Sequence, residues 1–160
     1  MISLSIDDKK VQEGLRTLIQ RSSNPSRAMV AISKRMLEST ELNFRQQGRP
    51  KWKPMAASTA AMGGAGRKLL QKSGAMAASI QMGSSSSAAW VGTNKPYAAF
   101  QQFGTKAHKI KAKNKKALAF GGKFAKQVNH PGLAARPFLA LTETDKSDIL
   151  SIIGTHLSQI

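Results

Sequence analysis

The chain has 160 residues, 41% of them hydrophobic and 6% aromatic, with a formal net charge of +17. This length predicts one domain over residues 1–160. The absence of cysteine excludes disulfides and thiolate metal ligands. No apolar run approaches the roughly 20 residues that span a bilayer, and residues 1–10 lack the basic start and apolar run of a signal peptide. We therefore expect no membrane partner.

The positive charge is confined to the middle of the sequence. All 8 acidic residues lie in the first 41 or the last 18 positions, where 8 Lys and Arg balance them. Between Glu41 and Glu143 there are 17 basic residues and no acidic one. Ordinary soluble domains intersperse both signs. The imbalance predicts a partner that supplies negative charge, with DNA as the first candidate and an acidic protein ring as the second.

The start of the chain predicts a strand and a helix. Ile2, Leu4 and Ile6 alternate with serines, which is typical of a short, half-buried strand. A helix should follow Asp7 and Asp8, because negative charge favours a helix N-terminus. One face of this helix holds Val11, Leu15, Leu18 and Ile19.

A second helix is predicted from about Pro25 to Gln47. Asn24 is a favourable cap, and proline is favoured in the first turn of a helix. Gly48 and Pro50 favour its end. Its inward-facing residues should be Met29, Ile32, Met36, Leu37, Thr40 and Phe44.

The middle of the chain predicts short elements separated by glycine, proline and serine. Residues 49–66 should form a loop with room for one short helix. Met76–Met82 and Ala88–Thr93 resemble two strands of a hairpin joined by four serines. Residues 96–103 should form a short helix that ends at Gly104.

The rest of the chain predicts more strand and a final helix. Strands are expected at Ile110, 118–120 and 124–128. Thr142 or Thr144 should cap the last helix. The order of elements predicts an α+β domain, in which N-terminal helices and a C-terminal helix pack on a small, mostly antiparallel sheet with a long basic loop or arm. The apolar stripe of the last helix is Ile149, Ile152, Ile153, Leu157 and Ile160.

The sequence offers few groups for catalysis. His108, His130 and His156 are scattered without metal-ligand spacing, and His156 falls on the apolar stripe of the last helix, where a structural role is expected. The acid-free middle has no carboxylate pair for acid–base chemistry. The glycine-rich residues 63–68 lack the full spacing of a phosphate-binding loop. We expect no enzyme, no cofactor and no metal site.

The lysine run is the positive signal. Eight lysines and no acid lie between Thr105 and Lys126, a pattern that attracts phosphates or acidic surfaces, although a solvated loop is the alternative. Alternate lysines of the run would project from one side of an extended arm. Lysine in place of arginine favours diffuse attraction to a backbone over base reading. The predicted contacts with DNA or an acidic partner are Lys106, Lys109, Lys111, Lys113, Lys115, Lys116, Lys123 and Lys126.

Several short motifs occur in a fixed order from about residue 40 to 141. Their main residues are Phe44, Gly48, Pro50, Trp52, Leu70, Ser73, Gly74, Tyr97, Gln102, Phe103, Gly104, Pro131, Gly132, Arg136, Pro137 and Phe138. This series resembles the phage virion morphogenesis family, which includes Mu-type morphogenesis proteins and the tail completion proteins of P2-like phages. Two departures are Met76, where the family has Leu, and residues 60–64, where it is more polar.

These motifs also predict structure. Trp52, between two prolines, should be a rigid anchor that caps this domain's core or fills a neighbour's pocket. We expect Trp52 and Phe138 to be buried, and at least two of Tyr97, Phe100 and Phe103 to pack together. Residues 105–135 should form an excursion that Phe138 closes, and in a ring it would cross to the adjacent subunit.

The resemblance implies a structural protein of the phage neck or tail end. It would form a ring that completes the tail or joins it to the DNA-filled head. We expect this ring to have six subunits, with twelve as the next candidate. Its neighbours would be tail terminator, tail tube or connector proteins, with DNA crossing the channel as a further candidate. The location would be the virion, and the host cytoplasm during assembly. The alternatives are a basic DNA- or RNA-binding protein and an assembly factor absent from the mature virion.

Overall fold

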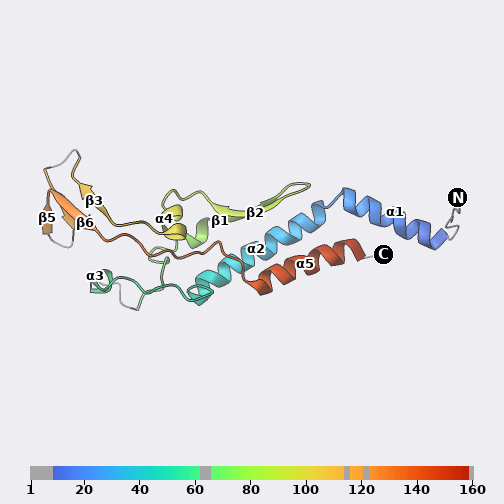
Figure 1. Ribbon diagram of the computed structural model, residues 1–160, viewed down its shortest axis with the longest axis horizontal. Helices are drawn as coiled ribbons and strands as arrows, with labels where there is room; N and C mark the ends of the chain where they lie inside the picture. The colour runs from blue at the N-terminus through green and yellow to red at the C-terminus, as the bar shows by residue number, and fades with distance from the viewer. Residues whose placement is uncertain (1–8, 62–65, 114–115, 121–122, 159–160) are drawn as a thin grey trace, which may run out of the picture. The chain divides into compact units, whose positions relative to one another are not determined.

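A computed structural model describes residues 9–61, 66–113, 116–120 and 123–158. The expected strand at residues 2–6 and the acidic pair that follows it lie outside these ranges. Figure 1 shows the elements in chain order. They are α1 (Lys9–Ser23), α2 (Ser26–Gln46), α3 (Ala57–Thr59), the 3-10 turn η2 (Ala77–Ser79), β1 (Ile80–Ser84), β2 (Ala89–Thr93), α4 (Ala98–Phe103), β3 (His108–Lys111), β4 (Leu118–Phe120), β5 (Lys123–Ala125), β6 (Gln127–His130) and α5 (Glu143–Ser158).

The α+β class is confirmed, but the described strands do not gather in one sheet. They form three two-stranded pairs, β1 with β2, β3 with β6, and β4 with β5. The β3–β6 and β4–β5 pairs are antiparallel. The predicted strand at Met76–Met82 begins only at Ile80, because the residues before it form η2. Each strand has only three to five residues, too short to build a broad sheet of its own.

The chain divides into two compact units. Unit 1 comprises Met1–Ser39, Gln81–Gly92 and Leu141–Ile160, and unit 2 comprises Thr40–Ile80 and Thr93–Ala140. The division passes through α2, between Ser39 and Thr40. The expectation of a single domain over 1–160 stays a prediction.

In unit 1, α5 lies alongside the first part of α2 (Figure 1). A capping box begins α5: the Asp145 amide donates to Thr142 Oγ1 at 3.2 Å, and the Thr142 amide donates to the Asp145 carboxylate at 2.8 Å. Each side chain therefore satisfies a backbone donor that the helix leaves free. Thr142 is thus the cap, one of the two alternatives that the sequence left open. The β1–β2 hairpin contacts α2, because Ser33 Oγ of α2 lies 3.9 Å from Met82 Sδ of β1.

A partly buried ionic cluster joins α2 to α5. Arg35 Nη2 lies 2.6 Å from Asp145 Oδ1 and 2.8 Å from Asp148 Oδ2. Ser39 Oγ donates to Asp145 at 2.7 Å, and Asp145 is 0% exposed. The hydrogen bond to Asp148 and the charges of Asp145, Asp148 and Glu38 raise the pKa of Arg35. Hydrogen bonds from several donors make this buried carboxylate tolerable in a low-dielectric site.

The apolar face predicted for α1 is exposed at the two of its positions whose side chains the structure describes. Leu18 is 37% exposed and Ile19 is 67% exposed, while the side chains of Val11 and Leu15 lie outside the description. Likewise Ile153 is 37% exposed on α5. His156 is half-buried, and its Nε2 lies 3.3 Å from the Arg21 carbonyl oxygen, in agreement with a structural role.

Candidate assembly surface

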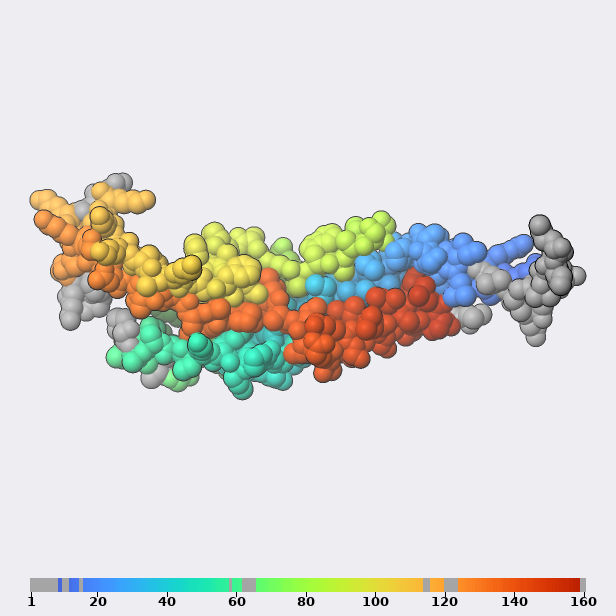
Figure 2. Space-filling view, viewed as in Figure 1, coloured from blue at the N-terminus to red at the C-terminus, as the bar shows by residue number. Residues whose placement is uncertain are grey.

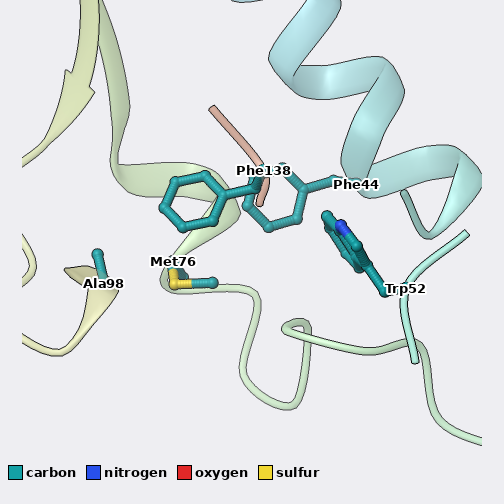
Figure 3. Close-up of a cluster of buried hydrophobic side chains, with 5 residues drawn as sticks. All are labelled: Phe44, Trp52, Met76, Ala98 and Phe138. Atoms are coloured by element: carbon teal, nitrogen blue, oxygen red, sulfur yellow. The ribbon is translucent and has the colours of Figure 1, made fainter. Parts of the chain in front are cut away.

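An aromatic cluster forms the core of unit 2. Phe44 from the end of α2, Trp52 from the following loop and Phe138 pack together with Met76 and Ala98 (Figure 3). The ring centroid of Phe44 lies 5.9 Å from that of Trp52 and 5.5 Å from that of Phe138, distances at which aromatic pairs attract. Trp52 is 7% exposed and Phe138 is 0% exposed. The prediction that both are buried is confirmed, and Trp52 belongs to the core of its own chain.

Gly48 makes the turn that brings Trp52 against α2. Its φ is +98°, and a Cβ at this position would lie 2.5 Å from Trp52 Cδ1. The Trp52 amide donates to the Gln47 carbonyl at 2.8 Å, and the indole Nε1 donates to the Pro137 carbonyl at 3.1 Å. Only glycine combines this backbone conformation with so close an approach. The motif from Gly48 to Trp52 therefore shapes the core, and Pro50 within it is exposed.

Two side-chain amides hold the segment that carries Phe138. Asn43 Nδ2 donates to the carbonyl oxygens of Phe138 and Ala140 at 2.9 and 2.8 Å. Gln102 Oε1 accepts from the amides of Phe138 and Leu139 at 3.0 and 3.1 Å. Gln102 belonged to the motif series, whereas Asn43 was missed. The one sequence signal for Asn43 was its place beside Phe44 on the inward side of α2.

Two glycines close the base of the excursion at residues 105–135. Thr105 and Leu133 exchange backbone hydrogen bonds of 3.0 and 3.1 Å. Gly104 has φ +73°, and a Cβ there would lie 2.6 Å from the Leu133 carbonyl oxygen. Gly132 has φ +91°, and its Cβ would collide with the Thr105 carbonyl oxygen. The segment therefore leaves and returns at one pinned point of unit 2.

The excursion contains a two-stranded ribbon with two different faces. In the β3–β6 register, Lys109 is opposite Asn129 and Lys111 is opposite Gln127. Opposed residues of an antiparallel pair share a face, so these lysines lie on one polar side. The other face holds Ile110 and Val128, together with His108 and His130, whose rings stack at 5.0 Å.

The predicted contact lysines are displayed on this segment. Lys106, Lys109, Lys111, Lys113, Lys116 and Lys126 are exposed. Long side chains of this yellow-to-orange part of the chain stand out from the surface in Figure 2. Lys115 lies outside the described residues, and Lys123 lies in β5 with its side chain undescribed. Their contact with DNA or an acidic partner stays a prediction.

Charge is divided unequally between the units. The segments of unit 2 contain 17 Lys and Arg and one acidic residue, Glu41, for a net charge of +16. Those of unit 1 contain 8 basic and 7 acidic residues, for a net charge of +1. Unit 2 thus carries nearly all of the chain's net charge of +17. Its one acidic residue cannot neutralise its 17 basic residues.

The remaining motif residues differ in their surroundings. Arg136 donates to the carbonyl oxygens of Lys53 and Pro54 at 3.2 and 3.1 Å, and burial lowers the pKa of its guanidinium. Leu70 packs against the aromatic cluster with φ 61°. Gly74 has φ +71°. Ser73, Pro131 and Pro137 are exposed.

The prediction that the α4 aromatics pack together is wrong. Tyr97, Phe100 and Phe103 are 44%, 55% and 78% exposed, and α4 buries Ala98. In the described residues the aromatic ring contacts join Phe44 to Trp52 and Phe138, and His108 to His130. A helix of only six residues presents one small face to the core, and that face is the one with Ala98.

The described residues contain no group of three or more His, Asp or Glu side chains placed to hold a metal ion. None of their helices has the length and apolarity needed to cross a membrane.

Comparison with known proteins shows what the motif series represents. The sequence profile of the phage virion morphogenesis family matches residues 6–158. The chain belongs to this family. A relative from Haemophilus influenzae, "Mu-like prophage FluMu G protein 2", is 33% identical over 157 residues, which cover 98% of this chain and 96% of the relative. No solved structure gives a significant match. Membership of the family indicates a structural or assembly role in building phage particles.

Proposed function

We propose that this protein is a structural component of the phage neck or tail end. It forms a closed ring that completes the tail or joins it to the DNA-filled head. It has no catalytic role, and it acts through contacts with itself and with neighbouring tail terminator, tail tube or connector proteins. Its final location is the virion, after assembly in the host cytoplasm.

The segregation of charge between the two units carries this proposal. Unit 2 has a net charge of +16 and unit 1 a net charge of +1. A unit with so little internal compensation attracts a surface or polymer of opposite sign. In a phage morphogenesis protein, the two such surfaces are the DNA that crosses the particle and an acidic ring of an adjacent protein.

We propose six subunits for the ring, on the resemblance to the family, and the charge of the subunits bears on how the ring assembles. Equal charges of +17 on each subunit repel one another. We therefore expect the isolated protein to be monomeric at low salt and to assemble on a template ring. A dodecamer in the particle, or a single copy, would contradict the six-fold ring.

The copy number in purified virions tests the proposal. Quantitative mass spectrometry against the major tube protein should give six copies per particle, and labelling should place them at the neck or tail end. A chain that is abundant in infected cells but missing from virions would identify an assembly factor. A variable copy number that follows DNA content would favour a nucleic-acid-binding protein.

Salt dependence separates DNA from an acidic protein ring as the partner of unit 2. Binding to phosphates releases counterions, so affinity for a random-sequence duplex should fall steeply between 50 and 200 mM salt, by about 10³ for six contacts. Binding should also be insensitive to sequence, because lysine in place of arginine favours diffuse attraction to the phosphate backbone over base reading. Negligible DNA binding at 50 mM salt would leave the acidic protein ring as the partner.

A further inference from the structure

Unit 2 contains a cavity beside its aromatic core. Its volume is about 940 Å³, which falls in the range of ligand-binding sites. Leu69, Leu70 and Met76 line it, and the same residues belong to the aromatic cluster or pack against it. Met55 and Leu133 add further apolar surface to the lining. The core therefore forms part of the cavity wall, and this wall favours an apolar side chain over a hydrated ion.

Hydrogen bonds within the lining hold the cavity in shape. The Arg136 guanidinium donates to the carbonyl oxygens of Lys53 and Pro54 at 3.2 and 3.1 Å, and all three residues line the cavity. Leu69, on another stretch of the chain, donates its backbone N–H to Gln47 Oε1. The lining is therefore fixed before a partner arrives, and a pre-formed site binds at a lower cost in ordering.

The lining also carries positive charge without acids to balance it. The described residues that line the cavity include no Asp or Glu, and Glu41, the one acid in the segments of unit 2, is not among them. Cations beside an apolar surface favour a partner that supplies negative charge. Besides Arg136, the cations of the lining are four exposed residues, Lys53, Arg67, Lys68 and Lys72.

The arrangement of these charges selects one class of anionic partner. Duplex DNA has phosphates at its surface but keeps its bases stacked, so it offers no apolar group that could enter the cavity. A fatty acid carries a single charge at one end, whereas the cations come from three stretches of the chain, at residue 53, residues 67–72 and residue 136. In an extended peptide, neighbouring side chains project to opposite sides. An acidic peptide can therefore insert an apolar side chain and place carboxylates on either side of it.

We propose that this cavity binds an acidic segment of a neighbouring protein of the phage particle. An apolar side chain of that segment contacts the wall that the core provides, and flanking carboxylates meet the exposed cations of the lining. The proposal rests on the structural role put forward above and specifies one contact of unit 2 with a neighbour. It places this contact at the cavity and not at the lysine run of the excursion.

Photo-cross-linking in the full-length chain tests the contact. Tyr97, which lines the cavity and is 44% exposed, is replaced by the photoreactive residue benzoylphenylalanine. The matched control carries the same replacement at Phe103, which lies on α4, is 78% exposed and is not part of the described lining. Cells that assemble particles and purified virions are both irradiated, and mass spectrometry identifies the peptides that become joined.

The proposal expects one dominant product from position 97, formed with a segment of another particle protein in which acids flank an apolar residue. Adding K68E/K72E should reduce this product about tenfold, which corresponds to about 1.4 kcal/mol. Adding K109E/K111E, which alters the net charge equally, should leave it unchanged. Met55→Ser removes apolar lining but no charge, and it should reduce the product about fivefold, or about 1 kcal/mol. Unfolding midpoints within about 2 °C of the parent would show that each variant is folded.

A binding measurement on the captured segment checks its chemistry. The segment, synthesised as a peptide, should bind the purified full-length chain. Changing its acids to the corresponding amides, or its apolar residue to serine, should weaken binding about tenfold in each case. A peptide that binds equally well without its acids or without its apolar residue would contradict the proposed recognition.

Several results of the cross-linking would overturn the proposal. They are equal products from positions 97 and 103, equal losses in the two charge variants, or a product at position 97 formed only with DNA, with a second copy of this chain or with a segment that lacks acids. A ring counted in virions without the expected product would refute the docking and leave the proposed function standing. The expected product in cells, for a chain missing from virions, would do the reverse.

Discussion

The two units of this chain use their charged residues in opposite ways. In unit 1, acids and bases are nearly equal in number, and Arg35, Asp145 and Asp148 form a cluster that joins α2 to α5. In unit 2, the core is aromatic, and the cations have one acidic residue to balance them. Charge in unit 1 therefore serves folding, while most of the positive charge in unit 2 has no acidic residue of the same unit to balance it. Substitutions in each unit should separate these two uses.

The largest loss of stability should come from the aromatic core of unit 2. Trp52→Ala or Phe138→Ala should lower the free energy of unfolding by about 3–5 kcal/mol, because a large buried ring leaves a cavity. At about 2–4 °C per kcal/mol, the thermal midpoint should fall by at least 6 °C or so. Phe103→Ala, at a position 78% exposed, is the control and should change stability by less than about 0.5 kcal/mol. Equal losses at buried and exposed rings would contradict this account of the core.

The ionic cluster of unit 1 should give the next largest effect. Asp145→Asn keeps the shape of the side chain but removes the charge that Arg35 faces at 2.6 Å. We expect a loss of about 2–3 kcal/mol, below the 3–5 typical of a fully buried pair, because Asp148 still binds the guanidinium. Chemical denaturation of the variant and the parent measures this loss in the free energy of unfolding. Glu143→Gln is the matched control, since its exposed pair with Lys146 should contribute at most about 1 kcal/mol. A loss as small as that of the control would show that the cluster is not part of the fold's stability.

The base of the excursion should show a smaller, local effect. Gly132→Ala places a Cβ against the Thr105 carbonyl at a φ of +91°, which should cost about 1–3 kcal/mol. Gly92→Ala is the control, because its Cβ would meet nothing within 4 Å. Amide exchange should accelerate at Thr105 and Leu133 in the first variant only. Unchanged exchange there would mean that the two ends of the excursion are not pinned by this contact.

The smallest effect on stability should accompany the largest effect on assembly. Replacing Lys109, Lys111, Lys113 and Lys115 by Glu should change stability by only about 0.5 kcal/mol per site, as expected for surface positions. The yield of complete, infectious particles should nevertheless collapse, because the surface that we propose to contact DNA or an acidic ring changes sign. The same four positions changed to Arg keep the charge and form the control. Normal particle yield from the Glu variant would identify the run as a solvated loop, and a collapsed midpoint would make it part of the fold.

Local patterns in the sequence predicted a large part of this architecture. Asn24 and Gly48 bracket α2, Gly104 ends α4, and Thr142 caps α5, since caps and glycine turns depend on neighbours within a few residues. The charge imbalance is likewise a property of the sequence, and it coincides with unit 2. The ordered motifs identified the family, and Phe44, Trp52 and Phe138 among them build one core.

Tertiary structure alone decided which polar residues are buried and which apolar residues are not. Asn43 binds Phe138, 95 positions away, and Arg35 binds Asp145, 110 positions away. No periodicity within a helix can report partners at such distances, so the sequence did not identify the bonds that Asn43 and Asp145 make. Conversely, Phe100 and Phe103 lay at helical spacing, but the core accepts only the small face of Ala98. Burial depends on what the rest of the fold places opposite a side chain, and the local sequence does not contain that information.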